Sequence, residues 1–401
     1  MKKSHIDWCP VIPDHWEEKR IKDIAFLQSG NSITAMDIAE EGKYPVYGGN
    51  GLRGYTNNYT NDGDYVLIGR QGALCGNINY AYGKFYATEH AVVVYTKNEE
   101  ITYWLGETLK AANLNRLSMT AAQPGLAVST LNIQFIPYPP RKERIRIANY
   151  LAEKCTEIDT QMSLLTSKRD AYLRLKKSII NHAVTRGLNP NVKMKDSGIE
   201  WIGEVPEHWE VKRMKDIFFE RKELSLTGEE DLLSVSEFYG VARRKDKMNS
   251  DEEFESRADS LVGYKICKAH DLVINIMLAW KTGLGISDND GIVSPAYAVY
   301  EGRNIASHFY HYLLRSGMYV KEFKRHSKGI IDSRLRLYND RFNNISAIYP
   351  PLPEQRVIAT YLEDKCAKID TIVSNLDKQI SRYADLKRSL IDEVITGKRA
   401  V

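Results

Sequence analysis

The chain has little cysteine, and its cysteines form neither a metal-binding pattern nor a disulfide framework. Five are scattered through 401 residues, at Cys9, Cys75, Cys155, Cys267 and Cys366. The absence of a Cys-x-x-Cys pair or Cys/His cluster argues against structural zinc. No apolar run approaches the roughly 20 residues that cross a bilayer, and the N-terminus has no apolar signal core. We therefore expect a cytoplasmic protein without metal or membrane contact.

Motifs of common catalytic sites are also missing. There is no Gly-x4-Gly-Lys-Ser/Thr phosphate loop, no His-Glu-x-x-His zinc site and no Gly-x-Ser-x-Gly elbow. Neither Pro139-Pro140 nor Pro350-Pro351 follows Asp or Asn, unlike the loop with which amino-methyltransferases hold a target amine. Glu89 and His90 could form an acid–base pair, but adjacent residues on a strand face opposite ways. We predict no catalytic residue in this chain.

Charge of one sign is not in excess. Lysine and arginine number 56 against 52 acidic residues, a net charge of +4. Any site for a polyanion must therefore come from local patches. The strongest basic patch lies between residues 321 and 341 and consists of Lys321, Lys324, Arg325, Lys328, Arg334, Arg336 and Arg341, against Glu322, Asp332 and Asp340.

What the chain does contain is an internal repeat. "WCPVIPDHWEEKRIKDI", from Trp8, aligns with "WIGEVPEHWEVKRMKDI", from Trp201. "PPRKERIRIANYLAEKCTEID", from Pro139, aligns with "PPLPEQRVIATYLEDKCAKID", from Pro350. The chain is a tandem duplication, in which a Pro-x-His-Trp motif opens each half and a Pro-Pro element closes its variable block.

A long helical pattern follows each Pro-Pro element. Its apolar positions, seven residues apart, are Leu151, Ile158, Leu165, Tyr172 and Ile179 in the first half and Leu362, Ile369, Leu376, Tyr383 and Leu390 in the second. Heptads sustained in this way predict a coiled-coil seam. Gly187 with Pro190, and then Gly397, supply the stop signals. Each helix would have about 40 residues and a length of about 60 Å.

The connection between the halves sets the direction of the second helix. The second block begins at the far end of the first helix, and a block of about 150 residues is too compact to reach back along it. We expect an α+β protein in which two similar α/β domains are separated by two long helices, which form an antiparallel, pseudo-twofold symmetric coiled coil. The alternative is that each helix lies on the surface of its own domain.

Both variable blocks follow one plan. "DYVLIGRQGALCGNINYAY" and "HDLVINIMLAWKTGLGIS" each predict strand, loop and strand, and "KFYATEHAVVVYT" and "GIVSPAYAVYEG" each predict a further strand. Helices are expected over 102–117 and 307–326. Different loops on one repeated scaffold suggest two related sites for two different targets.

The side chains of these loops suit a DNA groove, where Arg and Lys pair with guanine and Asn and Gln with adenine. The candidates are Arg53, Tyr55, Asn57, Arg70, Gln71, Asn77, Ser118 and Gln123 in the first block, and Arg243, Arg244, Lys245, Lys281, Thr282, Arg325, Lys328, Arg334 and Arg336 in the second. Each could instead be an ordinary solvated side chain.

The chain resembles the specificity subunits of type I restriction–modification systems. "SGIEWIGEVPEHWEVKRMKDI" is similar to the opening of a target recognition domain in that family, and "PPLPEQRVIATYLEDKCAKID" to the start of its spacer helix. "YPVYGGNGLRGYTNN" with "YVLIGRQGALCGNINYAYGKFYATEHAVV" is similar to one recurring type of recognition domain. "PPRKER" departs from the Pro-Pro-x-Pro-Glu-Gln that is frequent there, which leaves the start of the first helix in doubt.

The resemblance implies a non-catalytic subunit that binds a bipartite DNA target, one half-site per domain, with a spacer that sets the gap. It implies two methyltransferase subunits as partners, which methylate adenine with S-adenosylmethionine, so that no cofactor lies in this chain. Two restriction subunits that use ATP and magnesium could join. The implied domains are the first recognition domain at 1–140, the first spacer helix at 141–187, a linker at 188–198, the second recognition domain at 199–350 and the second spacer helix at 351–401.

Two other functions remain open on the residues alone. One is a nuclease with unrecognised acidic residues, which would cut DNA by itself with magnesium. The other is a two-headed coiled-coil scaffold that binds protein or carbohydrate, which would have no salt-dependent affinity for DNA.

Overall fold

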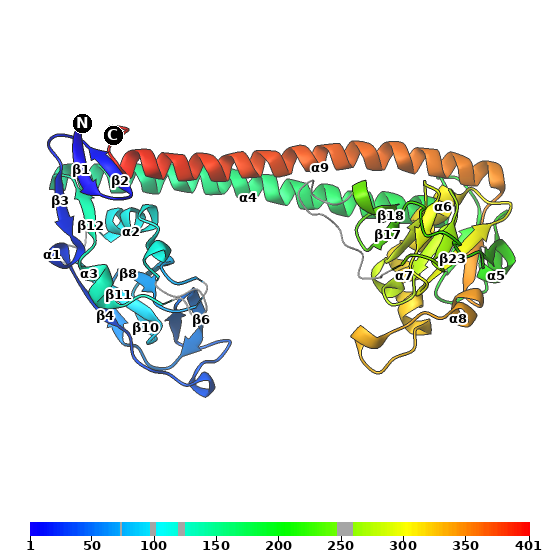
Figure 1. Cartoon of the computed structure of the whole chain (residues 1–401), viewed down its shortest axis with the longest axis horizontal. Coiled ribbons are helices and arrows are strands. Elements are labelled where there is room, and N and C mark those ends of the chain that lie inside the picture. The colour runs from blue at the N-terminus through cyan, green and yellow to red at the C-terminus, as the bar shows by residue number, and fades with distance from the viewer. Residues whose placement is uncertain (73, 97–101, 119–124, 247–259) are drawn as a thin grey trace. The chain divides into compact units, whose positions relative to one another are not determined.

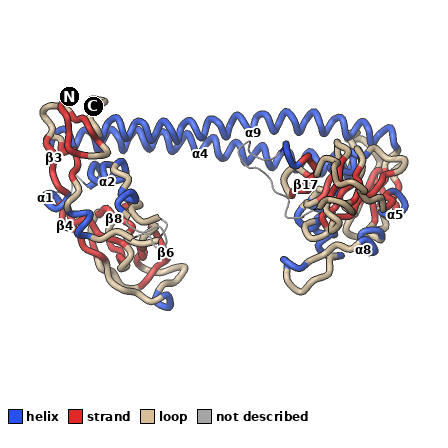
Figure 2. The backbone as a smooth tube through the Cα atoms, viewed as in Figure 1, coloured by secondary structure: helices blue, strands red, loops and turns tan. Residues whose placement is uncertain are grey.

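The computed structural model describes residues 1–72, 74–96, 102–118, 125–246 and 260–401. It divides into unit 1, formed by Met1–Thr166 and Asp377–Val401, and unit 2, formed by Ser167–Leu376. Both units combine strands with helices (Figures 1 and 2). Among the residues described, none of the helices combines the length and the hydropathy of a membrane span.

Two four-stranded sheets form the centre of unit 1. Its strands are β1 Lys2–Ile6, β2 Cys9–Ile12, β3 Glu17–Arg20, β4 Ala25–Ser29, β5 Tyr44–Gly48, β6 Gly51–Thr56, β7 Asn61–Asp62, β8 Tyr65–Gly69, β9 Ile78–Ala81, β10 Lys84–Ala87, β11 Ala91–Thr96 and β12 Phe135–Tyr138. Its short helices are α1 Ile21–Ile24, α2 Thr102–Ala111 and α3 Val128–Asn132. The strand orders are β4-β11-β8-β9, all antiparallel, and β6-β5-β10-β7.

Strand β8 shows why this sheet is apolar on both faces. Successive side chains of a strand point to opposite faces. Val66 and Ile68 join the core that contains Trp104 of α2, whereas Leu67 joins a second core with Phe85 of β10. The continuous apolar run of β8 therefore belongs to a strand that is covered on both sides.

Unit 2 repeats the first sheet of unit 1 and replaces the second. Its strands are β13 Met194–Asp196, β14 Glu204–Pro206, β15 Glu210–Arg213, β16 Phe218–Glu220, β17 Leu233–Ser236, β18 Gly240–Arg243, β19 Lys265–Cys267, β20 Leu272–Asn275, β21 Leu284–Ile286, β22 Gly291–Val293, β23 Tyr297–Gly302 and β24 Ser346–Tyr349. Its short helices are α5 Met214–Ile217, α6 Ser307–Leu314, α7 Gly317–His326 and α8 Asn339–Asn343. The sheet β16-β23-β20-β21 has the same plan as β4-β11-β8-β9, while the pairs β17-β18 and β19-β22 take the place of the other sheet.

The two long helices are α4 (Arg141–Arg186) and α9 (Leu352–Ile395), with 46 and 44 residues. In unit 1, Leu151 of α4 shares a core with Leu390 of α9. In unit 2, Val184 of α4 shares a core with Leu362 of α9. The start of α4 thus packs on the end of α9, and the end of α4 on the start of α9, so the helices pair antiparallel (Figure 1). The predicted α+β fold class with two paired long helices is confirmed.

The predicted seam residues are buried to different extents. Leu151, Ile158, Leu362, Ile369, Leu376 and Leu390 are buried, whereas Leu165, Tyr172, Ile179 and Tyr383 are partly exposed. Ion pairs flank the apolar contacts at equivalent positions of the repeat. Lys387 Nζ donates to Asp159 Oδ2 at 2.7 Å in unit 1, and Lys176 Nζ donates to Asp370 Oδ1 at 2.6 Å in unit 2.

Both helices begin in the same way, despite the departure in "PPRKER". Glu143 Oε2 lies 2.9 Å from His15 Nε2, and the equivalent Glu354 Oε2 lies 2.7 Å from His208 Nε2. Arg144 donates to the carbonyl of Pro139 at 2.6 Å, as Gln355 does to that of Pro350 at 2.7 Å. Because Arg144 supplies the N–H donor that Gln355 supplies in the other half, the substitution leaves the helix start unchanged.

Both helices end at the glycines that the sequence indicated. Gly187 has φ +74° and Gly397 has φ +71°, the left-handed conformation of a helix stop. A Cβ on Gly187 would lie 3.3 Å from Trp209 Cζ2, and one on Gly397 would lie 3.1 Å from Trp16 Cη2. The tryptophan of each Pro-x-His-Trp motif therefore packs on the helix stop within its own unit.

Several local predictions were wrong. "KFYATEHAVVVYT" and "GIVSPAYAVYEG" each contain two strands, and α2 ends at Ala111. The helix over 307–326 is two helices, because the extended backbone of Ser316 (φ −67°, ψ 151°) precedes Gly317. Glu89 and His90 lie in a turn, where the strand rule does not apply, and His90 Nε2 is 3.3 Å from Glu89 Oε1.

Candidate nucleic-acid interface

Two of the amide side chains predicted for unit 1, those of Gln71 and Asn77, lie in the loop after β8, which contacts the β5–β6 turn and Gly125. Asn77 Nδ2 donates to Asn50 Oδ1 at 2.9 Å, which joins the loop after β8 to the turn between β5 and β6. Gln71 forms a β-bridge with Gly125, whose N–H donates to Ser118 Oγ at 3.2 Å. The predicted residues of this loop cluster are Arg70, Gln71, Asn77 and Ser118. Gln123 lies outside the described residues.

The two predicted arginines of unit 1 have different surroundings. Arg70 Nη1 donates to Ser29 Oγ at 3.3 Å, so its guanidinium is directed toward β4. Arg53 lies on β6 and is exposed, and its Cδ covers Gly48, where a Cβ would come within 2.4 Å of it. Glycine at position 48 therefore lets the arginine side chain lie flat on the neighbouring strand.

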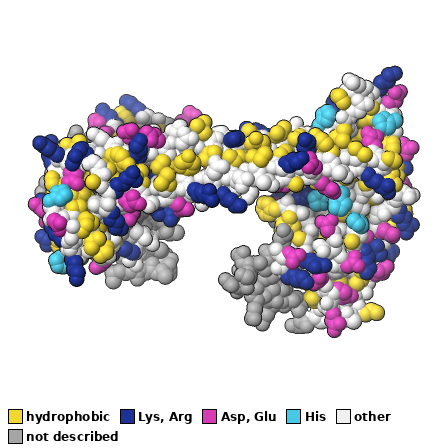
Figure 3. Space-filling model, turned by 90° about the horizontal axis from the view of Figure 1, so that it is seen from above, with side chains coloured by type: hydrophobic (Ala, Val, Ile, Leu, Met, Phe, Trp, Pro, Cys, Tyr) yellow, Lys and Arg dark blue, Asp and Glu magenta, His cyan; other side chains and the backbone are white. Residues whose placement is uncertain are grey.

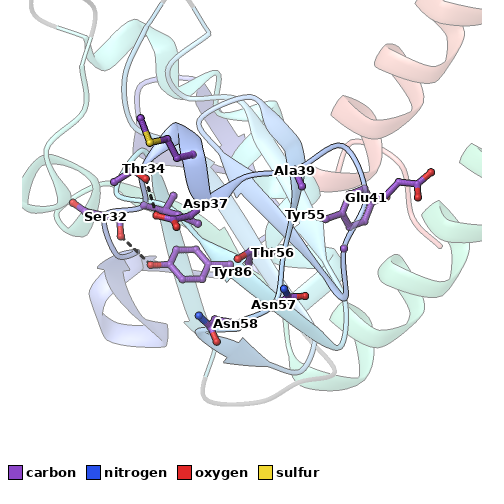
Figure 4. Close-up of a pocket in the computed structure, with 13 residues that line it drawn as sticks. Ser32, Thr34, Asp37, Ala39, Glu41, Tyr55, Thr56, Asn57, Asn58 and Tyr86 are labelled. Carbon is purple, nitrogen blue, oxygen red and sulfur yellow. Dashed lines mark hydrogen bonds between the residues drawn. The ribbon is translucent and has the colours of Figure 1, made fainter.

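Tyr55 and Asn57 line a separate pocket of about 660 Å³ (Figure 4). Tyr86 Oη donates to the carbonyl of Ser32 at 2.9 Å, and Thr34 Oγ1 donates to Asp37 Oδ2 at 2.6 Å, which orders the wall formed by residues 32–42. The labelled side chains carry hydroxyl, amide and carboxylate groups, so the pocket can both donate and accept hydrogen bonds.

In unit 2, Arg315 fixes two loops to each other. Its Nη1 donates to the carbonyls of Thr282 and Leu284 at 2.7 and 2.6 Å. Its Nη2 donates to the carbonyls of Glu237 and Phe238 at 3.0 and 3.1 Å. The tip of the β17–β18 hairpin is thereby held against the loop between β20 and β21, which carries the predicted residues Lys281 and Thr282.

The predicted cation Arg325 already has a carboxylate partner. Arg325 Nε donates to Glu322 Oε2 at 2.9 Å, and His326 Nε2 lies 2.9 Å from Glu322 Oε1. The ion pair with Glu322 raises the pKa of Arg325. Nearby, the ammonium groups of Lys281 and Lys324 both lie 4.9 Å from the centre of the Trp280 ring. Through the Trp280 ring, the loop between β20 and β21 therefore packs against α7.

Arg243 and Lys245 lie at the other end of the β17–β18 hairpin and share one acidic partner. Lys245 Nζ is 2.7 Å and Arg243 Nε is 3.3 Å from the Asp231 carboxylate. The hydrogen bond from Lys245 lowers the pKa of Asp231. Arg244 N–H donates to the carbonyl of Leu232 at 2.9 Å. The structure therefore does not bring these three residues to the hairpin tip.

Lys328, Arg334 and Arg336 lie together on the loop that follows α7. Backbone hydrogen bonds of 2.9 Å run both ways between Lys328 and Arg336 and close the loop. Arg336 Nη1 donates to the carbonyl of Leu335 at 2.8 Å. Sequence reasoning did not single out Phe238 at the hairpin tip or Ile330 in this loop, both of which are exposed. The available signal was an apolar residue in a turn, in "EFYG" and in "KGIID", the second of which also contains a cation.

His311 sits behind the hairpin and is expected to make unit 2 sensitive to acid. Ile286 N–H donates to His311 Nδ1 at 3.3 Å. Burial first, and then the charges of Arg315 and His308, lower the pKa of His311 from 6.5 to about 3. In the unfolded chain His311 takes up a proton near pH 6.5, so stability is full above that pH and falls as the pH is lowered toward 3.

Replacing His311 by Asn tests this expectation, because the side-chain amide oxygen of Asn can accept the hydrogen bond from Ile286 N–H and does not titrate. The stability lost between pH 7 and pH 5 should be about 1–2 kcal/mol smaller in the variant, as measured by urea unfolding. The exposed His182 provides the control as His182→Asn. An unchanged pH dependence in His311→Asn would exclude His311 as the cause.

No group of three or more His, Cys, Asp or Glu residues in the described part of the chain is arranged to hold a metal ion. The chemistry that these surfaces offer is hydrogen bonding and positive charge from loops that rest on repeated sheets. Cationic side chains suit phosphates, and amides suit base edges.

Comparison with known proteins agrees with this description. The model of the type I restriction modification DNA specificity domain matches residues 13–163 and 206–382. The EcoprrI specificity subunit of Escherichia coli is 42% identical over 139 residues, which are 34% of this chain and 35% of that protein. The MjaVIII specificity subunit of Methanocaldococcus jannaschii is 23% identical over an alignment of 418 positions, which covers 96% of this chain and 93% of that protein.

Solved structures share the fold. A chain from a structure on complex assembly and conformational transition of the type I R–M system aligns with a TM-score of 0.67 at 14% identity, over 96% of this chain and 98% of that one. The HsdS subunit from Thermoanaerobacter tengcongensis aligns with a TM-score of 0.50 at 13% identity, over 97% of this chain and 98% of that one.

Proposed function

Because the chain belongs to the family of type I restriction–modification DNA specificity subunits, we propose that it selects the DNA sequence on which such a complex acts and is not itself catalytic. The observation that carries the proposal is a repeated sheet with divergent loops. The order β4-β11-β8-β9 recurs as β16-β23-β20-β21, while the neighbouring strands and loops differ. A repeated support with different loops suits two readers of two different sequences.

Each unit would read one half of a bipartite target. In unit 1 the loop cluster offers the amides of Gln71 and Asn77, which suit adenine. In unit 2 the exposed cations Lys328 and Arg334 suit guanine or phosphate. We expect the paired residues Arg243, Lys245 and Arg325 to contribute less to base reading, because contact with DNA would compete with their carboxylate partners.

The long helices would serve as the spacer and as the platform for partner subunits. Figure 3 shows hydrophobic side chains along the exposed face of these helices. Leu175 of α4 and Leu386 of α9 are equivalent in the repeat, and both are about half exposed, at 47% and 52%. Two equivalent apolar positions suit two copies of one partner. The partners would be two methyltransferase subunits, which hold S-adenosylmethionine, and two restriction subunits, which use ATP and magnesium, could join.

Exchange of one recognition domain tests this function. Residues 6–139 are replaced by the first block of another family member, and the chain is expressed with its methyltransferase. Genomic methylation mapping should show a change in one half of the target only. The other half and the gap should stay the same, because unit 2 and both helices are unchanged.

Three results would contradict the proposal: an unchanged target, a change in both halves, or cleavage of DNA by the purified chain alone with magnesium. The first would show that residues 6–139 do not determine the target sequence. The second would show that the halves are not read independently. The third would place catalysis in this chain.

A further inference from the structure

The loop between α7 and α8 exposes two adjacent isoleucines. Ile330 is 98% exposed and Ile331 is 54% exposed. Single exposed apolar residues are ordinary, but an adjacent pair at a loop tip leaves apolar area that the unit itself does not cover. In Figure 1 this segment projects from the body of unit 2.

We propose that Ile330 is an apolar wedge that enters a groove of the DNA and separates two stacked base pairs of the second half-site. The inference rests on the proposed function of the chain. It adds a specificity-determining residue whose side chain carries no hydrogen-bonding group. Such a residue reads the ease with which a base step opens, not the pattern of donors and acceptors.

The loop holds Ile330 outward by contacts that do not involve its side chain. Mutual backbone hydrogen bonds of 2.9 Å between Lys328 and Arg336 close the base of the loop. Gly329 has φ +156°, and a Cβ there would lie 2.6 Å from the carbonyl oxygen of Arg334. Glycine thus permits the close approach of the two sides. The tip is in place before DNA arrives, which reduces the ordering cost of binding.

The loop is also anchored to the core of unit 2. Leu335 and Leu337 are buried, and Leu337 N–H donates to the carbonyl of Ile276 at 2.9 Å. Lys324 Nζ on α7 donates to Asp332 Oδ2 at 3.0 Å. Unit 2 therefore buries the C-terminal side of the loop and leaves the isoleucines exposed. Because the loop is fixed to the core, its tip can stay in place when it pushes two base pairs apart.

The charge around the isoleucines selects nucleic acid as the occupant. Lys328 and Arg334 flank them in the sequence, and no carboxylate of the described residues forms an ion pair with either. Lys281 and Lys324 both lie on the Trp280 ring, and Lys324 also pairs with Asp332 of the loop. An apolar tip between cations matches the arrangement with which groove-binding proteins insert a wedge while their cations hold the adjacent phosphates.

The test uses the full chain in complex with its methyltransferase. The probe is a duplex with the sequence that methylation mapping identifies, and 2-aminopurine replaces one adenine at a time in the second half-site. Stacking quenches the fluorescence of 2-aminopurine, so an opened step becomes bright. Binding of the wild-type complex should raise the fluorescence at one step. Ile330→Ala should abolish that rise and weaken binding by about tenfold, while Ile330→Met should retain the rise.

Two control variants separate the wedge from other contributions. Leu226→Ala removes an equally exposed apolar side chain (89%) elsewhere in unit 2 and should change neither signal nor affinity. Lys328→Ala should weaken binding and lower the salt slope by about one, whereas Ile330→Ala should keep the wild-type slope.

The outcomes distinguish this inference from the proposed function. Ile330→Ala with wild-type fluorescence and affinity would overturn the wedge and leave the specificity role intact. Loss of methyltransferase from the purified Ile330→Ala complex would also overturn it, because the loop would then be a protein contact. A wild-type complex without salt-dependent DNA affinity would overturn the proposed function itself.

Discussion

Replacement of Asp271 by Ala is expected to lower the free energy of unfolding of unit 2 by about 3–5 kcal/mol. Asp271 Oδ2 accepts a hydrogen bond of 2.7 Å from Arg221 Nε, and Oδ1 accepts one of 3.2 Å from Arg221 Nη2. The side chains are only 4% and 16% exposed. The alanine variant would leave the Arg221 guanidinium in a poorly hydrated place with only the more exposed carboxylate of Glu223, 3.3 Å from its Nη1. Removing one partner of a buried ion pair costs more than the pair itself contributes.

The same carboxylate also orders the turn before β20. Lys268 N–H donates to Asp271 Oδ2 at 2.8 Å, and Arg221 follows directly after β16. Loss of Asp271 should therefore loosen both the turn and the β16 edge of the sheet. Urea unfolding measures the total effect, and hydrogen–deuterium exchange should place the loss of protection in β16 and β20.

A double variant and an exposed control separate the two contributions. Arg221→Met with Asp271→Leu removes both charges and should be more stable than Asp271→Ala alone. Asp290, which lies between β21 and β22, is an exposed carboxylate that contacts the same turn, because its Oδ1 accepts from Ala269 N–H at 2.8 Å. Asp290→Ala should cost about 1 kcal/mol. If Asp271→Ala and Asp290→Ala lower the free energy of unfolding equally, burial does not explain the contribution of the Arg221–Asp271 pair to stability.

The repeat made the framework predictable from the sequence. Residues that recur in the sequence recur in the contacts, as His15 with Glu143 and His208 with Glu354 show. The partners are far apart in the sequence, but each belongs to a short motif that occurs in both halves, the Pro-x-His-Trp motif or the first turn after the Pro-Pro element. Arg144 and Gln355 occupy equivalent positions and make the same hydrogen bond, to the carbonyl of Pro139 and of Pro350 respectively. The hydrogen bond is therefore repeated even where the residue type differs.

The candidate site was less predictable, because its ion pairs lie in segments that do not recur between the halves. The sequence does not show that Asp231 lies between Arg243 and Lys245. It places Glu322 one helical turn before Arg325, but it does not show that Glu322 is buried. Nor did it reveal the break between α6 and α7, because the apolar pattern continues through it. Base reading by the predicted side chains stays a prediction.

Arg315 lies at that break, and its replacement by Met is expected to destabilise unit 2 by about 3 kcal/mol. Methionine keeps the apolar stem and removes the donors. The guanidinium donates to four backbone carbonyls, at 2.6–3.1 Å, of Glu237, Phe238, Thr282 and Leu284. Loss of the cation leaves these carbonyls without that donor in a partly buried place. The non-glycine residue Thr282, at φ +65°, would also lose a bond that holds its strained backbone.

The functional consequence of Arg315→Met should exceed the loss of stability. The hairpin tip with Phe238 and the loop with Lys281 would no longer hold a fixed geometry, so recognition of the second half-site should weaken while the first half-site is still read. Methylation mapping should therefore show relaxed sequence choice in one half of the target. Hydrogen–deuterium exchange should rise in β18 and β21 but not in the sheet of unit 1.

Arg315→Lys separates charge from geometry. A single ammonium cannot reach four carbonyls from one position, because its donors lack the planar fork of the guanidinium. The lysine variant should therefore recover only part of the stability and little of the sequence choice. Full recovery by lysine would show that positive charge alone matters at this place. Wild-type stability and targeting in Arg315→Met would show that the hairpin and the loop hold their positions without the arginine.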